Sequence, residues 1–196
     1  MKKLLIIVVL LVANIASAQT YIPKETKVAI VPVRSITGEK WQALTDKQIA
    51  HGGKFLKEEF EKRNFVVIDA ETVAQAIQNL KIDFADEEVW KRETLYALGN
   101  LLQADLVIFV VITDTDQRLI QQFLVAKREG TATLKVWMVD AKKKEPIVSA
   151  KTIKGKSGGG VFAGLDKGSD RQIIAVANGL RDLLKDWLKP YPIIGN

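Results

Sequence analysis

The stretch DLVIFVVITD, from Asp105 to Asp114, constrains how the rest of this 196-residue chain can fold. Its apolar run is unbroken from Leu106 to Ile112 and is rich in β-branched residues. A strand that is exposed on one face alternates apolar with polar residues, whereas a strand that is covered on both faces does not. The stretch therefore predicts a central strand with other elements packed on both of its faces.

Strand and helix patterns alternate before this central strand. KVAIVPV (Lys27–Val33) and FVVID (Phe65–Asp69) have the composition of buried strands. Between them, Thr45 and Gln48 fit a capping box, in which both side chains bond to backbone amides at a helix start. The expected elements are a strand at 27–33, a helix from 45, a strand at 65–69, and helices at 73–80 and 86–103.

The residues after the central strand predict more strands in antiparallel hairpins. A strand-like stretch lies at 119–126. TATLKVWMVD (131–140) then alternates apolar with polar residues, so Thr131, Thr133 and Lys135 are expected on one face. AKKKEP is expected to turn the chain into a partner strand, IVSAKTIK, at 147–154.

An amphipathic helix pattern ends the chain. Ser169 and Gln172 fit a second capping box, and Pro190 ends the pattern. The whole order predicts an α/β (α+β) fold, in which helices pack on a mixed sheet. We expect a single domain over residues 19–196.

The first residues, MKKLLIIVVLLVANIASAQT, predict export. Two lysines, an apolar run at 4–13 and an Ala-x-Ala site are typical of a signal peptide that is cleaved after Ala18. The run is shorter than the ~20 residues that span a bilayer. We therefore expect a periplasmic or secreted protein with no transmembrane segment after cleavage. The chain has no cysteine, so we expect no lipid anchor.

The charge of the chain bears on its partners. The formal net charge is +6 at pH 7, and two of the lysines belong to the expected signal peptide. The other lysines are spread along the chain rather than clustered with aromatic residues, which does not favour nucleic acid as a partner. We expect a protein or another component of the cell envelope to be bound instead.

One run, AKTIKGKSGGG (Ala150–Gly160), matches two catalytic patterns. It fits a relaxed P-loop ending in Lys156 and Ser157, and the G-x-S-x-G of a nucleophile elbow. A P-loop needs a helix starting at the Lys-Ser pair, and the elbow needs a histidine after its serine. Three glycines follow Ser157, and the single histidine, His51, precedes it and is expected to be a solvated surface residue. We therefore expect a strand followed by a flexible glycine-rich connection, with a small hydrolase or phosphate-binding enzyme using residues 155–160 as the alternative.

Metal and cofactor chemistry has little support in the sequence. One histidine and no cysteine exclude most zinc sites. Asp114 and Asp116 could hold a hard cation through carboxylate oxygens, although such residues more often cap a turn. We expect no catalytic residues, no cofactor and no metal, and we leave a weak cation site at Asp114 and Asp116 open.

The order of these patterns resembles a known family. LGNLLQADLVI (Leu98–Ile108) and LKVWMVDAKKKEPIVSAKTI (Leu134–Ile153) are similar to the periplasmic domain of the CsgG-like family, the curli-secretion proteins of the bacterial outer membrane. A more distant resemblance is to the amino-terminal domain of TolB. The resemblance implies a fold like the anticodon-binding domain, an envelope location, and protein–protein assembly rather than catalysis. Pore formers of this family also carry a lipid anchor and two membrane hairpins, which we do not expect in this chain.

The sequence thus predicts an exported, non-enzymatic module that binds a protein or envelope component, with a homo-oligomer as one form of assembly. Two segments are the candidate contact surfaces. RSITGEKW carries Arg34 and Trp41, residue types that often anchor protein interfaces. The glycine-rich segment carries Lys154 and Lys156.

Overall fold

The structure is a computed structural model that describes residues 21–37, 42–122, 125–161 and 169–194. The strands are β1 (Lys27–Ile30), β2 (Arg34–Ser35), β3 (Val66–Val67), β4 (Leu106–Gln122), β5 (Val125–Asp140) and β6 (Glu145–Val161). The helices are α2 (Gln42–Glu61), α3 (Ala70–Asn79), α4 (Arg92–Leu102) and α5 (Ser169–Leu188), with a single 3-10 turn at Glu87–Val89. The expected signal peptide, 1–18, lies outside the described residues. Among those residues, no helix is both long enough and apolar enough to cross a bilayer.

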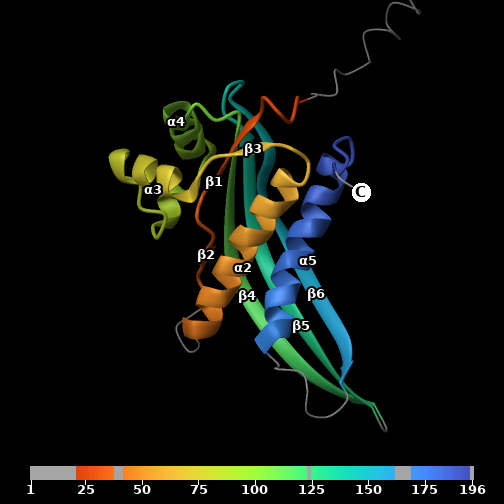
Figure 1. Ribbon diagram of the computed structural model, residues 1–196. Coiled ribbons are helices and arrows are strands. Elements are labelled where there is room, and N and C mark those ends of the chain that lie inside the picture. The colour runs from red at the N-terminus through yellow and green to blue at the C-terminus, as the bar shows by residue number, and fades with distance from the viewer. Residues whose placement is uncertain (1–20, 38–41, 123–124, 162–168, 195–196) are drawn as a thin grey trace, which may run out of the picture.

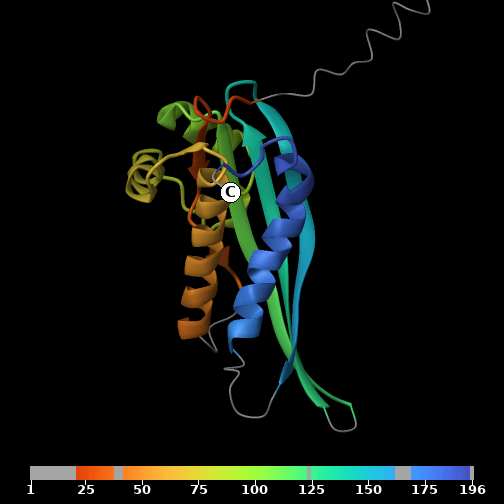
Figure 2. The same ribbon diagram turned by 45° about the vertical axis from the view of Figure 1, so that its right-hand side comes forward.

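One mixed sheet joins all the described strands. Its order is β3-β1-β4-β5-β6, and β2 also pairs with β4. β1 pairs in parallel with β3 and with β4, whereas β4, β5 and β6 form antiparallel ladders. Helices pack on both faces of this sheet (Figure 1 and Figure 2), which confirms the predicted α/β (α+β) class. The central position of β4 is confirmed as well, because Leu106 to Ile112 are at most 1% exposed.

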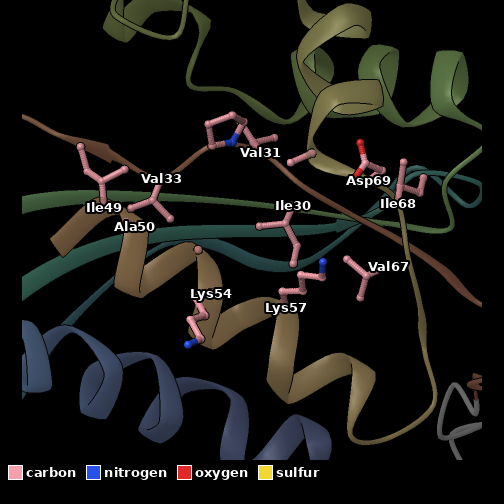
Figure 3. A pocket seen from close by; sticks show the side chains of 13 residues that line it. Ile30, Val31, Val33, Ile49, Ala50, Lys54, Lys57, Val67, Ile68 and Asp69 are labelled. Carbon is pink, nitrogen blue, oxygen red and sulfur yellow. The ribbon is translucent and has the colours of Figure 1, made fainter. Parts of the chain in front are cut away.

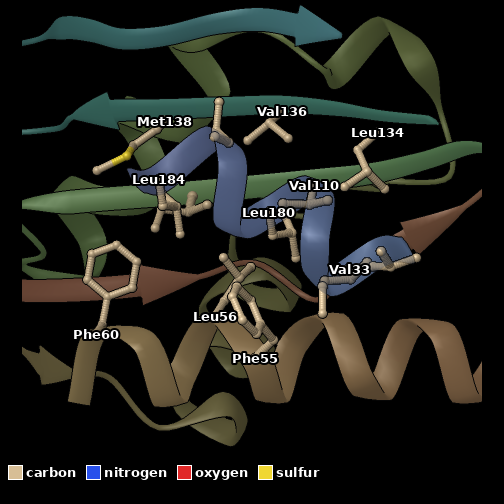
Figure 4. Packing of buried hydrophobic residues seen from close by; sticks show 14 of the residues in the cluster. Val33, Phe55, Leu56, Phe60, Val110, Leu134, Val136, Met138, Leu180 and Leu184 are labelled. Atoms are coloured by element: carbon tan, nitrogen blue, oxygen red, sulfur yellow. The ribbon is translucent and has the colours of Figure 1, made fainter. Parts of the chain in front are cut away.

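Successive side chains of β4 enter two different cores. The first core lies under α2 and α5 and includes Leu56, Phe60, Val110, Leu134, Val136, Met138, Leu180 and Leu184 (Figure 4). The second lies under α3 and α4 and includes Val73, Trp90, Leu98, Val107, Phe109, Trp137 and Val139. Full burial of one large apolar side chain stabilises a fold by about 1.5–3 kcal/mol. The unbroken apolar run of β4 is therefore explained by burial on both sides.

β4 is one strand of 17 residues rather than the two stretches expected at 106–112 and 119–126. A β-bulge between Ile112 and Asp114 lets it continue in register with β5. We call the part beyond this bulge the arm: residues 114–122 of β4, 125–133 of β5 and 154–161 of β6. The tip of the arm extends past the ends of α2 and α5 (Figure 1 and Figure 2).

The capping box predicted at Thr45 and Gln48 is wrong. α2 begins at Gln42, so Thr45 lies inside the helix. Gln48 is 1% exposed, and its Nε2 donates a hydrogen bond to Oε1 of Gln172 at 3.3 Å. The two glutamines that the sequence assigned to separate helix starts therefore link α2 to α5.

The single helix expected at 86–103 is also interrupted. Trp90 turns inward after the 3-10 turn, and its indole N–H donates to the carbonyl of Phe84 at 3.1 Å. The ring lies 5.9 Å from the ring of Phe109, centroid to centroid. α4 consequently begins only at Arg92.

Candidate functional site

The segment that follows Lys154 belongs to β6 and is not a flexible connection. Residues from Gly155 to Val161 pair with β5 in a continuous antiparallel register. Ser157 is 5% exposed, and its Oγ donates to the carbonyl of Arg171 at the start of α5. The expectation of a glycine-rich loop is therefore wrong, because a hairpin strand can accommodate glycine where a helix packs on it.

The enzyme alternative at residues 155–160 depended on that loop. In an extended strand, successive amides point to opposite edges and cannot converge on one phosphate as loop amides do, and the Ser157 hydroxyl is already bonded to a backbone carbonyl. His51 lies exposed on α2, as expected. The structure thus removes the geometric basis of both catalytic patterns.

Close backbone contact explains the first glycine of the run. A Cβ on Gly155 would lie 1.8 Å from the carbonyl oxygen of Ala175 and 2.6 Å from the amide nitrogen of Gly179, both in α5. On β5, a Cβ on Gly130 would lie 2.4 Å from the carbonyl carbon of Arg171. α5 therefore rests directly on the backbone of β5 and β6 and covers one face of the arm as far as the row of Gly130 and Ser157.

The opposite face of the arm carries polar side chains in cross-strand rows. Lys154 pairs with Thr133, which pairs with Asp114 on the far side. In the next row, Lys156, Thr131 and Asp116 are aligned in the same way. Directly opposed residues on neighbouring strands share a face. We call these six residues the arm face: Asp114, Asp116, Thr131, Thr133, Lys154 and Lys156.

The arm face is electrically polarised across the strands. Neighbouring strands lie ~4.8 Å apart, so the lysine flank on β6 and the carboxylate flank on β4 are ~10 Å apart with threonines between them. Both lysines and Asp114 are exposed, and the threonines are half-buried. Such a face can bind a surface that carries the complementary charge pattern.

Asp116 has a partner within the arm. Its Oδ2 accepts a hydrogen bond from Nε of Arg118 at 2.8 Å, and its Oδ1 accepts from the amide of Gln117 at 2.8 Å. The hydrogen bond from Arg118 is the main cause that lowers the pKa of the Asp116 carboxyl below its usual value. Within the described residues, no group of three or more acidic or histidine side chains could hold a metal ion. A cation held by Asp114 and Asp116 would have to compete with the Arg118 guanidinium for the Asp116 carboxylate.

The bulge in β4 determines on which face these carboxylates lie. Thr113 is the extra residue, and its Oγ1 donates to the carbonyl of Thr133 at 3.2 Å. Without this insertion, Asp114 and Asp116 would continue the series of even-numbered residues that point toward α5. The acidic flank of the arm face was missed in the sequence because alternation alone places it on the wrong side.

Lys135 lies one row closer to the body of the sheet. It pairs with Val111 and with Thr152. Its Nζ lies 5.3 Å from the centroid of the Trp137 ring, within the range of a cation–π contact. The alternation in TATLKVWMVD correctly predicted that Lys135 lies on the same side of the sheet as Thr131 and Thr133.

The four predicted contact residues do not form one cluster. Lys154 and Lys156 lie together on the arm face. Arg34 is exposed on β2 and aligned with Val111, so it faces the same side of the sheet from the opposite edge. Three strand spacings, ~14 Å, separate that edge from β6. Trp41 lies outside the described residues.

Comparison with known proteins gives structural similarity only. No family model and no curated protein matches this chain. Among solved structures, it is similar to the lipoprotein GNA1162 from Neisseria meningitidis, with 14% identity, a TM-score of 0.48, and coverage of 84% of this chain and 99% of that one. It is also similar to the LpoB C-terminal domain from Salmonella enterica, with 12% identity, a TM-score of 0.41, and coverage of 77% and 92%. The PelC dodecamer from Paraburkholderia phytofirmans matches with 12% identity, a TM-score of 0.41, and coverage of 82% and 90%. At these values the similarities carry no conclusion about what this chain does.

Proposed function

We propose that this protein is an exported, non-enzymatic module that binds a protein of the cell envelope through the arm face. The observation that supports the proposal is the construction of the arm. α5 holds one face rigidly, while the other presents a lysine flank, a threonine row and a carboxylate flank that no described helix covers. A surface that is ordered before binding loses little conformational entropy when a partner docks.

The free edge of β6 adds a second element to this surface. β6 has 17 residues and is the last strand of the sheet. The carbonyl of Lys156 is capped by Nδ2 of Asn178 at 2.8 Å. An extended segment of a partner could pair with the rest of the edge by strand addition, next to Lys154 and Lys156.

We also propose that the chain is related to the CsgG-like family and, more distantly, to the TolB amino-terminal domain. The signal peptide cleaved after Ala18, the periplasmic or secreted location and a homo-oligomer are parts of the same proposal. Protein–protein assembly is the activity that this resemblance implies, and the polarised arm face is a surface on which such assembly could occur.

Charge reversal on the arm face tests the proposal. The full chain, 1–196, would carry a carboxyl-terminal tag and be purified from the envelope of cells that naturally produce the protein, alongside the double variant Lys154→Glu/Lys156→Glu. We expect the co-purified partner to fall at least about tenfold for this variant, because two charge pairs across an interface become repulsive.

The matched control is Lys143→Glu/Lys144→Glu. These exposed lysines lie in the turn that joins β5 to β6, at the other end of β6 from the arm, and the variant has the same net charge. The control should recover the partner as well as the unaltered protein does. Equal recovery with the arm variant and the unaltered protein would contradict the proposal.

A further inference from the structure

A groove of about 390 Å³ lies away from the arm, between α2 and the ends of β1 and β3 (Figure 3). Its apolar lining comes mainly from Ile30, Val31, Val33, Ile49, Val67 and Ile68. Lys54, Lys57 and Asp69 contribute its charged groups. This volume is at the lower end of the range for pockets that hold small molecules.

The topology of the sheet places the groove where α/β folds commonly bind ligands. β1 and β3 are parallel neighbours, so their carboxyl ends lie at the same edge. From β1 the chain continues through β2 into α2 on one face, whereas from β3 it continues directly into α3 on the other. Neighbouring strands whose connections leave to opposite faces open a crevice outside their carboxyl ends.

Gly53 keeps the groove open. A Cβ on Gly53 would meet no atom within 4 Å. A Cβ on its neighbour Gly52, in contrast, would lie 3.4 Å from Val176 and 3.7 Å from Val33. Neighbouring side chains therefore limit the size of a side chain at position 52 but not at position 53, although glycine is unfavourable inside a helix. The absence of a side chain at Gly53 is what leaves room over the aliphatic lining.

The charges around the groove favour an anion. Lys54 and Lys57 make only long ion pairs, 3.8 Å to Glu58 and 3.8 Å to Glu61, with exposed side chains that can reorient. In Figure 3 the side chain of Lys57 runs toward Ile30 and Val67. The Asp69 carboxylate already accepts the amide of Glu71 at 2.8 Å, at the start of α3.

We infer that this groove binds a small amphipathic anion, with an aliphatic chain on the β1 and β3 side chains and an acidic head group at Lys57 and Lys54. The aliphatic lining would be removed from water by the chain of the ligand. The lysines supply the complementary charge. This site is separate from the arm face and does not depend on the function proposed for the arm.

Calorimetric titration with single-chain ligands tests the inference. Decanoate and decyl phosphate carry a carboxylate and a phosphate head group, respectively, on a ten-carbon chain. The ligand that binds with the lower dissociation constant identifies the preferred head group. We expect saturable binding of at least one of them, with a dissociation constant of about 10–100 µM. Acetate and decyltrimethylammonium should show no saturable binding. Absence of saturable binding by both anions, or equal binding of the cation, would overturn the inference.

Three variants locate the site. Gly53→Leu should fill the groove and weaken anion binding at least about tenfold while the protein stays folded, because the added side chain enters open space. Lys57→Gln should weaken binding about three- to tenfold. Lys47→Gln, an exposed lysine of α2 outside the groove, should bind as the unaltered protein does. Unchanged affinity in Gly53→Leu would place the ligand elsewhere and overturn the inference.

Discussion

Two glycines of this chain have opposite structural roles. Gly155 lies where β6 meets the backbone of α5, and a Cβ there would be 1.8 Å from a carbonyl oxygen of that helix. Gly53 is on α2 with open space around the position of its Cβ. Substitution by the same residue, alanine, should therefore change stability in opposite directions.

We expect Gly155→Ala to lower the free energy of unfolding by about 3 kcal/mol, since the backbone of α5 must move to admit a methyl group. Gly53→Ala should raise it by up to ~1 kcal/mol, because alanine favours the helix interior. Urea denaturation of both variants measures these changes. If Gly155→Ala unfolded at the same urea concentration as the unaltered protein, the close contact of α5 with β6 would be refuted.

Tyr21 gives the stability a dependence on alkaline pH. Its hydroxyl donates to Oδ2 of Asp140 at 3.0 Å, and Asp140 is 2% exposed. Burial, followed by the hydrogen bond to Asp140, raises the pKa of Tyr21 well above its usual value of 10.0. The folded state thus retains a proton that the unfolded state loses above pH ~10.

The stabilisation from Tyr21 is therefore fully present below pH ~10 and declines as the pH rises further. We expect the unaltered protein to be more stable than Tyr21→Phe at pH 8, and this advantage to shrink between pH 10 and 11.5. Urea denaturation across that range measures it, with Tyr96→Phe as a control for loss of a tyrosine elsewhere. A constant difference between the unaltered protein and Tyr21→Phe would show that the bond to Asp140 is not formed.

At the level of strands and helices, local patterns predicted the types of element but not where they end. The apolar run at 106–112 and the alternation at 131–140 identified β4 and β5. Each pattern directly reflects which faces of the strand are buried. The bulge at Thr113 could not be seen, because it depends on pairing with β5. The bond between Gln48 and Gln172 was equally inaccessible, as it joins residues 124 positions apart.

The same limit explains the error at β6. The glycines at 158–160 were expected to form a loop, because glycine weakens an isolated strand. In the structure Gly158, Gly159 and Gly160 pair with Glu129, Arg128 and Lys127 of β5, respectively. A long partner strand therefore determines the structure of this segment more than its own composition does.

Hydrogen exchange distinguishes a strand from a flexible connection. We expect alternate amides between Lys151 and Gly160, those that bond to β5, to exchange far more slowly than exposed loop amides. The amides between them, on the free edge, should exchange quickly. Uniformly fast exchange over the whole segment would contradict the assignment of β6 and remove the rigid arm. Spectra of the Gly155→Ala variant would show whether this protection depends on α5.

In the molecule as a whole, the described helices cover both faces of the sheet near β1 and β3, but only one face of the base of the arm. The sequence located Lys154 and Lys156, whereas the acidic flank opposite them required the register of three strands. The groove was not predicted at all, since it joins the ends of β1 and β3 to the middle of α2. Both candidate surfaces are therefore products of tertiary structure: the sequence identified two lysines of the arm face as contact residues and no residue of the groove.

Photo-crosslinking from the centre of the arm face tests the proposed function most directly. A photoreactive amino acid would replace Thr133, which leaves the lysine and carboxylate flanks intact, and a control protein would carry it in place of Lys143. In cells that naturally produce the protein, we predict a discrete adduct with a second polypeptide, or with another copy of this chain, from position 133 and none from position 143. No adduct from position 133, or the same adduct from both positions, would contradict binding through the arm face.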